Sequence, residues 1–523
     1  MRAEGQVLPR LPTRELWGVA ALILGWLALT AGWRSLALPD EGRYVGVAWE
    51  MLRSGDWLTP TLDGMPFFHK PPLFYWITAG ALKLFGMHEW AARVASVLGA
   101  TLGAFALYVF LRRWRSQRMA RWTVAVLCVQ PLFFIGAQFA NLDMLVAGCI
   151  SATILLAADA VLSMAHHAPS RSALVGAYVV AGLGVLAKGL IGLVLPALVI
   201  GVWLVISGRW RLLLRLCSLP GAALFLMITA PWFIAEQQRF PDFLHYFFVV
   251  QHFQRFAGGG FNNVQPFWFY PALLLLLSLP WLPWLTSLLR RQRQPGDAER
   301  DEIGGLMLVW LVCIVGFFSL PQSKLVGYVL PAVPPLAYFI GDSFVFRPPR
   351  PRLLFWWRVS LALTVLVSLG TIAYLARHPL KTSQGFADVL NRQRLAGEKV
   401  FMLRQYAYDL PFHARLTDPV TIVDDWRSPS VQASDNWRKE IADASQFASP
   451  QDRQVLIEPA RLLDGLCASP VSWVLGDAAV VRQEWPMLAE LPALMSDKGR
   501  TLWRIEAKAL DCRGTPNAGS ADK

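Results

Sequence analysis

Charged residues are scarce in this sequence. Asp, Glu, Lys and Arg make up 16% of its 523 residues, whereas about a quarter of an ordinary soluble domain is charged. Hydrophobic residues make up 55% of the chain, and the mean hydropathy is +0.40. This composition argues against a soluble globular enzyme and indicates an integral membrane protein.

The chain also lacks the short motifs of several common cofactor sites. It contains no Walker phosphate loop and no glycine pattern of a dinucleotide-binding fold, and its Cys and His residues lack the spacing of a zinc site. Four of the six cysteines lie in apolar stretches, where cysteine behaves as a small hydrophobic residue. Cys467 and Cys512 lie in the polar C-terminal part, where the sequence leaves open whether they form a disulfide.

Acidic residues are fewer than basic ones. The chain has 49 Lys and Arg against 36 Asp and Glu, which gives a net charge of +13. The basic residues cluster in short segments between apolar stretches, and such loops orient membrane proteins by staying in the cytoplasm. This pattern favours a membrane protein over a nucleic-acid-binding protein, so no nucleic-acid partner is expected.

Long apolar runs are abundant. A helix crosses the hydrocarbon of a bilayer in about 20 residues. The sequence predicts eleven spans, at residues 16–38, 91–111, 122–139, 144–163, 173–187, 190–206, 212–235, 266–289, 304–320, 325–345 and 353–376. The run 73–86 is either a further span or an interfacial helix, so the predicted architecture is a polytopic α-helical membrane protein with about 11 to 13 transmembrane helices.

The basic clusters predict the orientation of these spans. With eleven spans and a cytoplasmic N-terminus, the basic clusters all fall on the cytoplasmic side. The first apolar run lacks a small-residue cleavage site, so we expect it to stay as the first span. The segments expected on the opposite side are 39–90, 140–143, 188–189, 236–265, 321–324 and the tail from residue 377.

The tail differs in composition from the rest of the chain. The predicted domains are therefore 1–376, the transmembrane domain, and 377–523, a soluble α/β domain long enough for its own core. Helical stretches are expected at 459–466 and 484–493. Strands are expected at 399–403, 420–423, 454–457, 471–475 and 501–506.

Acidic residues recur on the side opposite the basic loops. Asp40 and Glu41 follow the first predicted span and open the polar stretch 38–76, which we expect to be a loop at the membrane surface. One such acid pair alone would be interpreted as solvated residues beside a helix. Asp143, however, lies in a tight connection between two apolar spans, where an acid needs an ion-pair partner or has a function. Lys188 is interpreted as a lysine that snorkels from a helix end.

Three turns on the same side offer cations. Lys70 precedes two prolines that stiffen the backbone, Arg255 precedes a run of three glycines, and Lys324 is followed by Tyr328. The positive-inside rule would keep such residues off this face. A phosphate group at the outer interface is their natural partner, because arginine binds it as a planar fork and lysine as a point charge.

The sequence resembles a known family in these segments. The DEGRY segment at 40–44, the KPPL turn at 70–73, Asp143, the QRF loop at 254–256 and the SKLxxYVLPxxPPLA segment at 323–337 are similar to the bacterial GT-C glycosyltransferases. These enzymes are relatives of the protein O-mannosyltransferases, and the subgroup most similar to the chain is the lipid A aminoarabinose transferases (ArnT-like). The resemblance covers about residues 15–345.

The resemblance implies a function and a set of site residues. It implies an inner-membrane glycosyltransferase that moves a sugar, 4-amino-4-deoxy-L-arabinose, from an undecaprenyl (polyprenyl) phosphate donor to lipid A on the periplasmic face, without a nucleotide sugar. This activity modifies lipopolysaccharide and confers polymyxin resistance. By position, Asp40 and Asp143 match the catalytic acids, and the donor phosphate contacts match Lys70, Arg255 and Tyr328, to which Lys324 is added. The residues expected to line the substrate cavity are Glu41, Arg43, Tyr44, His69 and His252.

One departure from the family pattern concerns a metal. Relatives often have Tyr and an acid shortly before the KPPL lysine, whereas this chain has Phe67 and His69. This difference weakens the transfer of a metal ligand from the family. His69 and His252 are zinc ligands by type, but a lone histidine at an interface is more often a satisfied polar residue. No cofactor is assigned, and a divalent metal stays an open alternative.

The chemistry of such a transfer agrees with these residues. Cleavage of the donor builds positive charge on the sugar and negative charge on the departing polyprenyl phosphate, which nearby cations would stabilise. Asp40 would act as a general base for a hydroxyl acceptor. For a lipid A phosphate, which is already ionised, it would orient the acceptor or stabilise the positive charge on the sugar.

Three other function classes are alternatives. A mannosyl or other hexosyl transferase acting on protein or another envelope glycan would share the fold and the donor chemistry. A transporter or flippase would show internal repeats and polar residues at mid-span, and the sequence has no such repeat. A structural or assembly protein would leave the acids and cations of the outer face without a role.

Overall fold

The structure, a computed structural model, describes residues 12–167, 170–254, 263–285, 298–345, 350–433, 435–510 and 512. Contacts within the chain divide it into two units. The first consists of Met1–Arg34, His69–Ala257 and Asn263–His378, and the second of Ser35–Phe68, Gly258–Asn262 and Pro379–Lys523. The predicted boundary after residue 376 stays a prediction, and these contacts group residues 35–68 with the C-terminal part.

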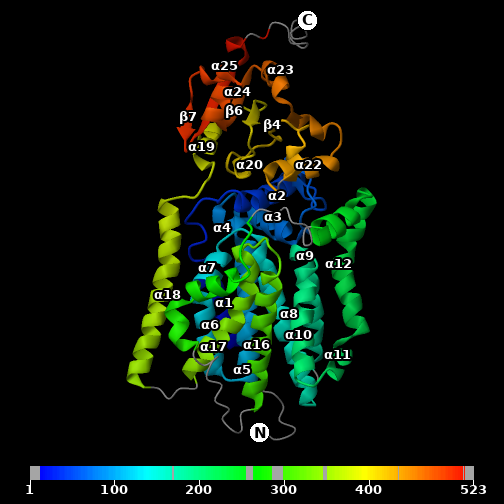
Figure 1. Cartoon of the computed structure of the whole chain (residues 1–523), viewed down its shortest axis with the longest axis vertical. Helices are drawn as coiled ribbons and strands as arrows, with labels where there is room; N and C mark the ends of the chain where they lie inside the picture. Colours follow the sequence, from blue (N-terminus) through cyan, green and yellow to red (C-terminus); the bar gives the residue numbers. More distant parts are fainter. Residues whose placement is uncertain are drawn as a thin grey trace. The chain divides into compact units, whose positions relative to one another are not determined.

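The named elements of the first unit, among its described residues, are all helices (Figure 1). Its elements are α1 (Thr13–Ala28), α3 (Leu73–Phe85), α4 (Glu89–Ala92), α5 (Val94–Trp114), α6 (Gln117–Val129), α7 (Pro131–Ala137), α8 (Leu142–Ala165), α9 (Arg171–Lys188), α10 (Ile191–Ile206), α11 (Arg211–Leu216), α12 (Leu219–Arg239), the π-helix η1 (His245–Gln254), α14 (Phe269–Leu277), the 3₁₀ helix η2 (Leu279–Trp284), α16 (Ala298–Ser319), the 3₁₀ helix η3 (Val326–Ala332), α17 (Val333–Val345) and α18 (Pro351–Arg377).

Every predicted span overlaps one of these helices or a consecutive pair, and residues 286–289 of the span at 266–289 lie outside the described residues. Seven helices among the described residues are long and apolar enough to cross a membrane, and the bent pair α6–α7 makes eight if it is counted as one span. The apolar helices α3 and α10 are shorter. The chain is therefore a polytopic α-helical membrane protein.

Several predicted spans are shorter or broken in the structure. Helix α1 ends at Ala28, ten residues before the predicted end at Leu38. The span at 122–139 bends by 69° at Pro131, because proline lacks an N–H group and disfavours helical backbone in the residue before it. The span at 212–235 breaks at Ser218, whose side chain accepts a hydrogen bond from Gly221 N and caps α12.

Small residues bring the central helices of this unit close together. Helix α5 packs along α8, and α8 packs along α9 (Figure 1). A Cβ atom added at Gly148 would lie 1.9 Å from the carbonyl oxygen of Gly99, and one at Gly99 would lie 2.4 Å from the Cα of Leu145. Only glycine fits at these positions, as is typical where membrane helices pack backbone against backbone.

The second unit joins a helix and a hairpin from residues 35–68 to the C-terminal α/β domain. Its elements are α2 (Asp40–Ser54), β1 (Thr61–Leu62), β2 (Met65–Pro66), α19 (Gln384–Gln393), β3 (Lys399–Leu403), α20 (Leu410–His413), β4 (Thr421–Val423), α21 (Ser430–Ala433), α22 (Trp437–Gln446), η4 (Asp452–Val455), β5 (Leu456–Ile457), η5 (Pro459–Arg461), α23 (Leu462–Cys467), β6 (Val471–Asp477), α24 (Ala478–Glu484), α25 (Pro486–Ala489), β7 (Met495–Asp497), β8 (Arg500–Glu506) and η6 (Ala507–Ala509).

The C-terminal domain is built on a six-stranded sheet in the order β5-β4-β3-β6-β8-β7. Strands β3 to β6 are parallel, and β7 and β8 complete one edge antiparallel. The five strands predicted from the sequence are confirmed, whereas β7 was not expected. Four consecutive residues of β3 are buried, as is typical of a parallel strand covered on both faces.

Cys467 and Cys512 form a disulfide, which settles the alternative that the sequence left open. The disulfide joins the end of α23 to the segment after β8 across a separation of 45 residues. Leu466, Trp503 and Leu510 form part of the buried core beside it. Such a link restricts the unfolded chain and stabilises this domain.

The hairpin β1–β2 carries a buried acid. Asp63 and Gly64 form its turn, both with positive φ, as a type I′ turn requires. Glu50 accepts hydrogen bonds from Asp63 N at 2.7 Å and Gly64 N at 2.9 Å, and Asp63 Oδ1 accepts one from Val420 N at 2.9 Å. Asp63 is buried, and this burial, together with the charge of Glu50, raises its pKa well above the ordinary range.

We expect the stability of this unit to depend on pH through Asp63. A carboxyl with a raised folded-state pKa stabilises the fold fully below its ordinary pKa, and this contribution is lost as pH rises through the raised value. The loss amounts to about 1.4 kcal/mol per pH unit between the ordinary pKa and the raised one, and it ends above the raised value. Thermal unfolding of the full chain from pH 5 to 8 should show a falling transition temperature, and Asp63→Asn should flatten it. The exposed Asp418→Asn is the control, and an unchanged slope in Asp63→Asn would contradict the expectation.

Candidate functional site

The DEGRY segment forms the first turns of a helix in the second unit. Helix α2 begins at Asp40, with Asp40 and Glu41 in its first turn, where the positive end of the helix dipole favours acids. Glu41 is fully buried, and its Oε2 accepts a hydrogen bond from Ala37 N at 2.9 Å. The expectation of a loop that follows directly on the first span is therefore wrong, because α1 ends at Ala28 and a helix starts at the acid pair.

Arg43 lies between two carboxylates. Its guanidinium forms ion pairs with Asp40 one turn earlier and with Glu440 of α22. It also lies over the ring of Tyr44, 5.2 Å from the centroid. About a third of the Asp40 side chain stays exposed, against 15% of Arg43. Asp40 is thus a carboxylate whose orientation is fixed by an arginine and which still meets solvent.

Asp143 occupies the first turn of α8 in the first unit. Asn141 caps this helix by accepting a hydrogen bond from Asp143 N at 3.0 Å. The Asp143 carboxylate forms an ion pair with Lys188, the last residue of α9, and the side chains are 7% and 12% exposed. The interpretation of Lys188 as a snorkelling lysine is therefore wrong, because its ammonium is paired with a buried acid.

Tyr328 completes this cluster from η3. Its ring centroid lies 4.3 Å from Lys188 Nζ and 5.4 Å from the ring centroid of Phe318. A Cβ atom at Gly327 would lie 2.2 Å from Asp143 Oδ2, so only glycine lets η3 approach the acid. Asp143, Lys188 and Tyr328, which we call the α8–α9–η3 cluster, thus combine an acid, a cation and a phenol on three helices.

Lys324 lies in the turn before η3 and is 4% exposed. Its Nζ donates hydrogen bonds to the carbonyl oxygens of Gln265, at 2.9 Å, and Pro321. An antiparallel bridge between Val264 and Ser323 joins the same two segments. These contacts tie the segment before α14 to the turn before η3, and a phosphate contact of Lys324 stays a prediction.

The remaining predicted site residues of the first unit lie before α3 and in η1. His69 is buried, with its ring centroid 6.2 Å from that of Tyr246. Lys70 is half-buried just before Pro71 and Pro72, the two residues that precede α3. His252 lies in η1, but its side chain lies outside the described residues, as does Arg255.

The predicted site residues therefore fall into two sets. Asp40, Glu41, Arg43 and Tyr44 belong to the second unit, and the others that the structure describes belong to the first. That both sets line one substrate cavity stays a prediction. Among the described side chains, no group of three or more His, Cys, Asp or Glu could hold a metal ion.

Sequence reasoning missed three partners of these residues. Lys188 was not expected to pair with Asp143, and neither Glu440 nor Tyr408 was connected with Arg43. Lys188 carried a signal, because both it and Asp143 interrupt apolar sequence on the same predicted side of the membrane. Glu440 lies 397 residues from Arg43, and no local pattern relates the two.

Three kinds of comparison relate the chain to known proteins. Residues 69–234 match the family model described as dolichyl-phosphate-mannose-protein mannosyltransferase. The relative from Erwinia tasmaniensis, an undecaprenyl phosphate-alpha-4-amino-4-deoxy-L-arabinose arabinosyl transferase, is 33% identical over 377 residues, which cover 68% of this chain and 65% of the relative. Proteins of the same name from Aeromonas salmonicida and Pseudomonas paraeruginosa are 32% and 31% identical, with 71% and 76% of this chain and 68% and 72% of the relative covered.

Solved structures have a similar fold. The crystal structure of ArnT from Cupriavidus metallidurans bound to undecaprenyl phosphate matches with a TM-score of 0.78 and 24% identity over 95% of this chain and 99% of that chain. The oligosaccharyltransferase of Archaeoglobus fulgidus matches with a TM-score of 0.52 and 16% identity, over 77% of this chain and 63% of that chain. At these identities the likeness concerns the fold.

Proposed function

Because the chain belongs to the family of undecaprenyl phosphate-alpha-4-amino-4-deoxy-L-arabinose arabinosyl transferases, we propose that it is a glycosyltransferase that moves 4-amino-4-deoxy-L-arabinose from undecaprenyl phosphate to lipid A. The GT-C fold, a multi-pass helical unit with a C-terminal α/β domain, agrees with this function. The observation that carries the proposal is the identity of 30% or more to relatives of that name across two thirds of their length.

The orientation of the chain is part of the proposal. The N-terminus lies in the cytoplasm, and α2, the turn at Lys70, the start of α8 and the C-terminal domain lie on the periplasmic side of the bacterial inner membrane. This orientation follows from the basic clusters of the short loops. The C-terminal disulfide supports it, because disulfides persist in the oxidising periplasm and are rare in the cytosol.

In the proposed mechanism the donor phosphate is the leaving group. Breaking the bond between the sugar and the phosphate leaves a second negative charge on the polyprenyl phosphate. In this proposal Lys70 and Tyr328 stabilise it, the first as a cation and the second as a hydrogen-bond donor. Asp143 holds Lys188 at the end of α9, and Lys188 in turn lies over the ring of Tyr328.

In this mechanism Asp40 contacts both the acceptor and the sugar. A lipid A phosphate is already ionised and attacks the anomeric carbon without losing a proton. Asp40 therefore stabilises the positive charge that develops on the sugar and orients the attacking group, and its own ion pair with Arg43 fixes the direction of the carboxylate. A carboxylate held in place before the reaction stabilises this charge without reorganisation.

The role of Lys70 gives a first prediction. Lys70→Ala should raise the KM for the polyprenyl-linked donor about tenfold or more, because an ion pair to a phosphate contributes about 1.5–3 kcal/mol. Steady-state rates of the detergent-solubilised full chain at varied donor concentration measure this. Lys83, an exposed lysine of α3, supplies the control Lys83→Ala. An unchanged KM in Lys70→Ala would place the phosphate elsewhere.

Mass spectrometry of lipid A tests the function itself. Cells that express the chain should contain lipid A with the added mass of one aminopentose on a phosphate, and cells without the chain should not. An added mass of one hexose would show a glycosyltransferase that uses a different sugar donor, in line with the mannosyltransferase family model at residues 69–234. If lipid A stayed unmodified and an envelope protein carried the added sugar, the acceptor would be a protein.

A further inference from the structure

Arg43 of helix α2 is held by residues of the C-terminal domain. Its guanidinium pairs with Glu440 of α22 as well as with Asp40, and its centre lies 5.5 Å from the ring centroid of Tyr408. The Tyr408 hydroxyl donates a hydrogen bond to the other oxygen of the Glu440 carboxylate. One carboxylate of the C-terminal domain thus binds both Arg43 and the tyrosine packed against it.

The charges around Arg43 keep this arrangement in one protonation state. Burial lowers the pKa of Arg43, but the carboxylate of Glu440, the two tyrosines and Asp40 raise it well above the ordinary value. Burial raises the pKa of Tyr408 well above its ordinary value, and Glu440 raises it further. Arg43 is therefore a cation and Tyr408 a neutral hydrogen-bond donor at all physiological pH values.

Helix α2 also touches this domain through its backbone. A Cβ atom at Gly42 would lie 2.7 Å from Asp409 N, and one at Gly46 would lie 3.2 Å from the carbonyl oxygen of Tyr408. Asp409 is fully buried and accepts hydrogen bonds from Thr382 Oγ1 at 2.9 Å and Ser383 N at 2.6 Å. The glycine of the DEGRY segment thus lets α2 lie directly against a segment that is fixed within the domain.

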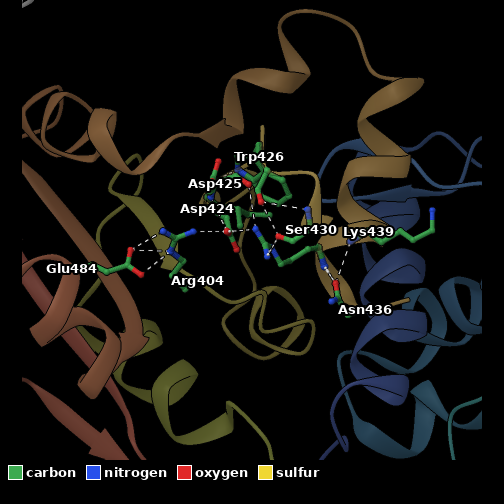
Figure 2. Close-up of polar contacts among 11 residues, drawn as sticks. Arg404, Asp424, Asp425, Trp426, Ser430, Asn436, Lys439 and Glu484 are labelled. Carbon is green, nitrogen blue, oxygen red and sulfur yellow. Dashed lines mark hydrogen bonds and ion pairs between the residues drawn. The ribbon is translucent and has the colours of Figure 1, made fainter. Parts of the chain in front are cut away.

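Helix α22, which carries Glu440, is anchored to the end of the parallel sheet. Figure 2 shows Asp424, just after β4, beside Arg404, just after β3, with Glu484 on the far side of Arg404. Asp424 also binds Arg438 of α22 at 2.9 Å. Asn436 caps the same helix by accepting hydrogen bonds from the backbone of residues 438 and 439.

From these contacts we propose that Glu440 and Tyr408 are positioning residues for the transfer reaction: they hold Arg43, and through it the carboxylate of Asp40. The C-terminal domain then takes part in catalysis by fixing the catalytic helix. This inference rests on the role of Asp40 under the proposed function. It assigns the domain a task in the reaction that is separate from any binding of substrate.

Removal of the Glu440 charge would change the geometry at Asp40. Arg43 would keep a single carboxylate partner and would turn toward it, so that the guanidinium would cover the Asp40 oxygens that meet the sugar. Displacement of a reacting group by about 1 Å can cost a hundredfold in rate. Donor binding, which we place on Lys70 and Tyr328, would change little.

The test compares kcat with KM in purified full-length variants. Glu440→Gln keeps the side-chain volume and removes the charge, and Tyr408→Phe removes only the hydroxyl. Glu440→Gln should lower kcat about tenfold to a hundredfold with the donor KM within about threefold, and Tyr408→Phe should have the same effect to a smaller degree. Glu440→Asp, which keeps the charge, should recover part of the loss. Glu458→Gln is the matched control, because its partner Arg427 is 90% exposed.

Three outcomes overturn the proposal. Wild-type kcat in Glu440→Gln, alongside an inactive Asp40→Asn, would remove the positioning role and leave the proposed function intact. A raised donor KM with unchanged kcat would make Glu440 part of the binding site. A loss of activity that matches a loss of folded protein in both Glu440→Gln and Tyr408→Phe would make the contacts structural. Full activity of Asp40→Asn would instead refute the catalytic assignment on which the inference rests.

Discussion

Asp40→Asn should lower the rate of sugar transfer by at least about a hundredfold, which is the lower end of the effect of a positioned acid or base. Asparagine has the shape of aspartate, so the helix start at residue 40 is kept. It lacks the negative charge that would stabilise the sugar cation and pair with Arg43. The measurement is the initial rate of transfer by the purified full chain.

The control for this variant is Asp388→Asn. Asp388 is an exposed acid on α19 in the same unit of the structure, so its replacement removes an equal charge away from α2. Its rate should equal that of the wild type. If Asp40→Asn folded normally and kept even a tenth of the wild-type rate, the principal catalytic role would belong to another residue.

Lys188→Met should inactivate the protein or prevent it from folding. The change leaves the Asp143 carboxylate, whose side chain is 7% exposed, without its cation near the membrane. Breaking one side of a buried ion pair costs about 3–5 kcal/mol, which is a large share of the stability of most proteins. Tyr328 would also lose the cation that lies 4.3 Å from its ring centroid.

A double variant separates folding from function in this cluster. Lys188→Met combined with Asp143→Asn removes both charges, so the thermal unfolding temperature in detergent should recover most of the loss. The transfer rate should stay low, because the proposed support of Tyr328 is still missing. Lys83→Met is the control on an exposed lysine. If Lys188→Met alone were as stable as the wild type, the ion pair of Lys188 with Asp143 would contribute little to stability.

The fold could be predicted largely from local sequence signals. Long apolar runs predict spans because the hydrocarbon core of a bilayer excludes polar segments. All eleven predicted spans overlap helices in the structure. The strands of the C-terminal domain were found because buried parallel strands are short apolar runs, as at Val471–Asp477. The bend at Pro131 and the break at Ser218 each have a local signal, a proline in one case and a capping serine in the other.

The site was harder to predict, because its contacts join distant residues. Asp40 and Asp143 stood out as acids in apolar surroundings, but their partners did not. Lys188 was interpreted from its own helix alone, although its ion-pair partner Asp143 lies on α8. Glu440 is an ordinary acid on an amphipathic helix, and only the fold brings it to Arg43. Sequence thus indicates which residues carry charge near the membrane but not which residues hold them.

Reconstituted transfer is the measurement that tests the central claim most directly. The purified full chain, in lipid nanodiscs, is given undecaprenyl phosphate carrying 4-amino-4-deoxy-L-arabinose together with lipid A, and the product is analysed by mass spectrometry. We predict lipid A with one added aminopentose, formed by the wild type and not by Asp40→Asn. Transfer from a mannosyl polyprenyl phosphate to a peptide, with no reaction of the aminoarabinose donor, would contradict the proposed function.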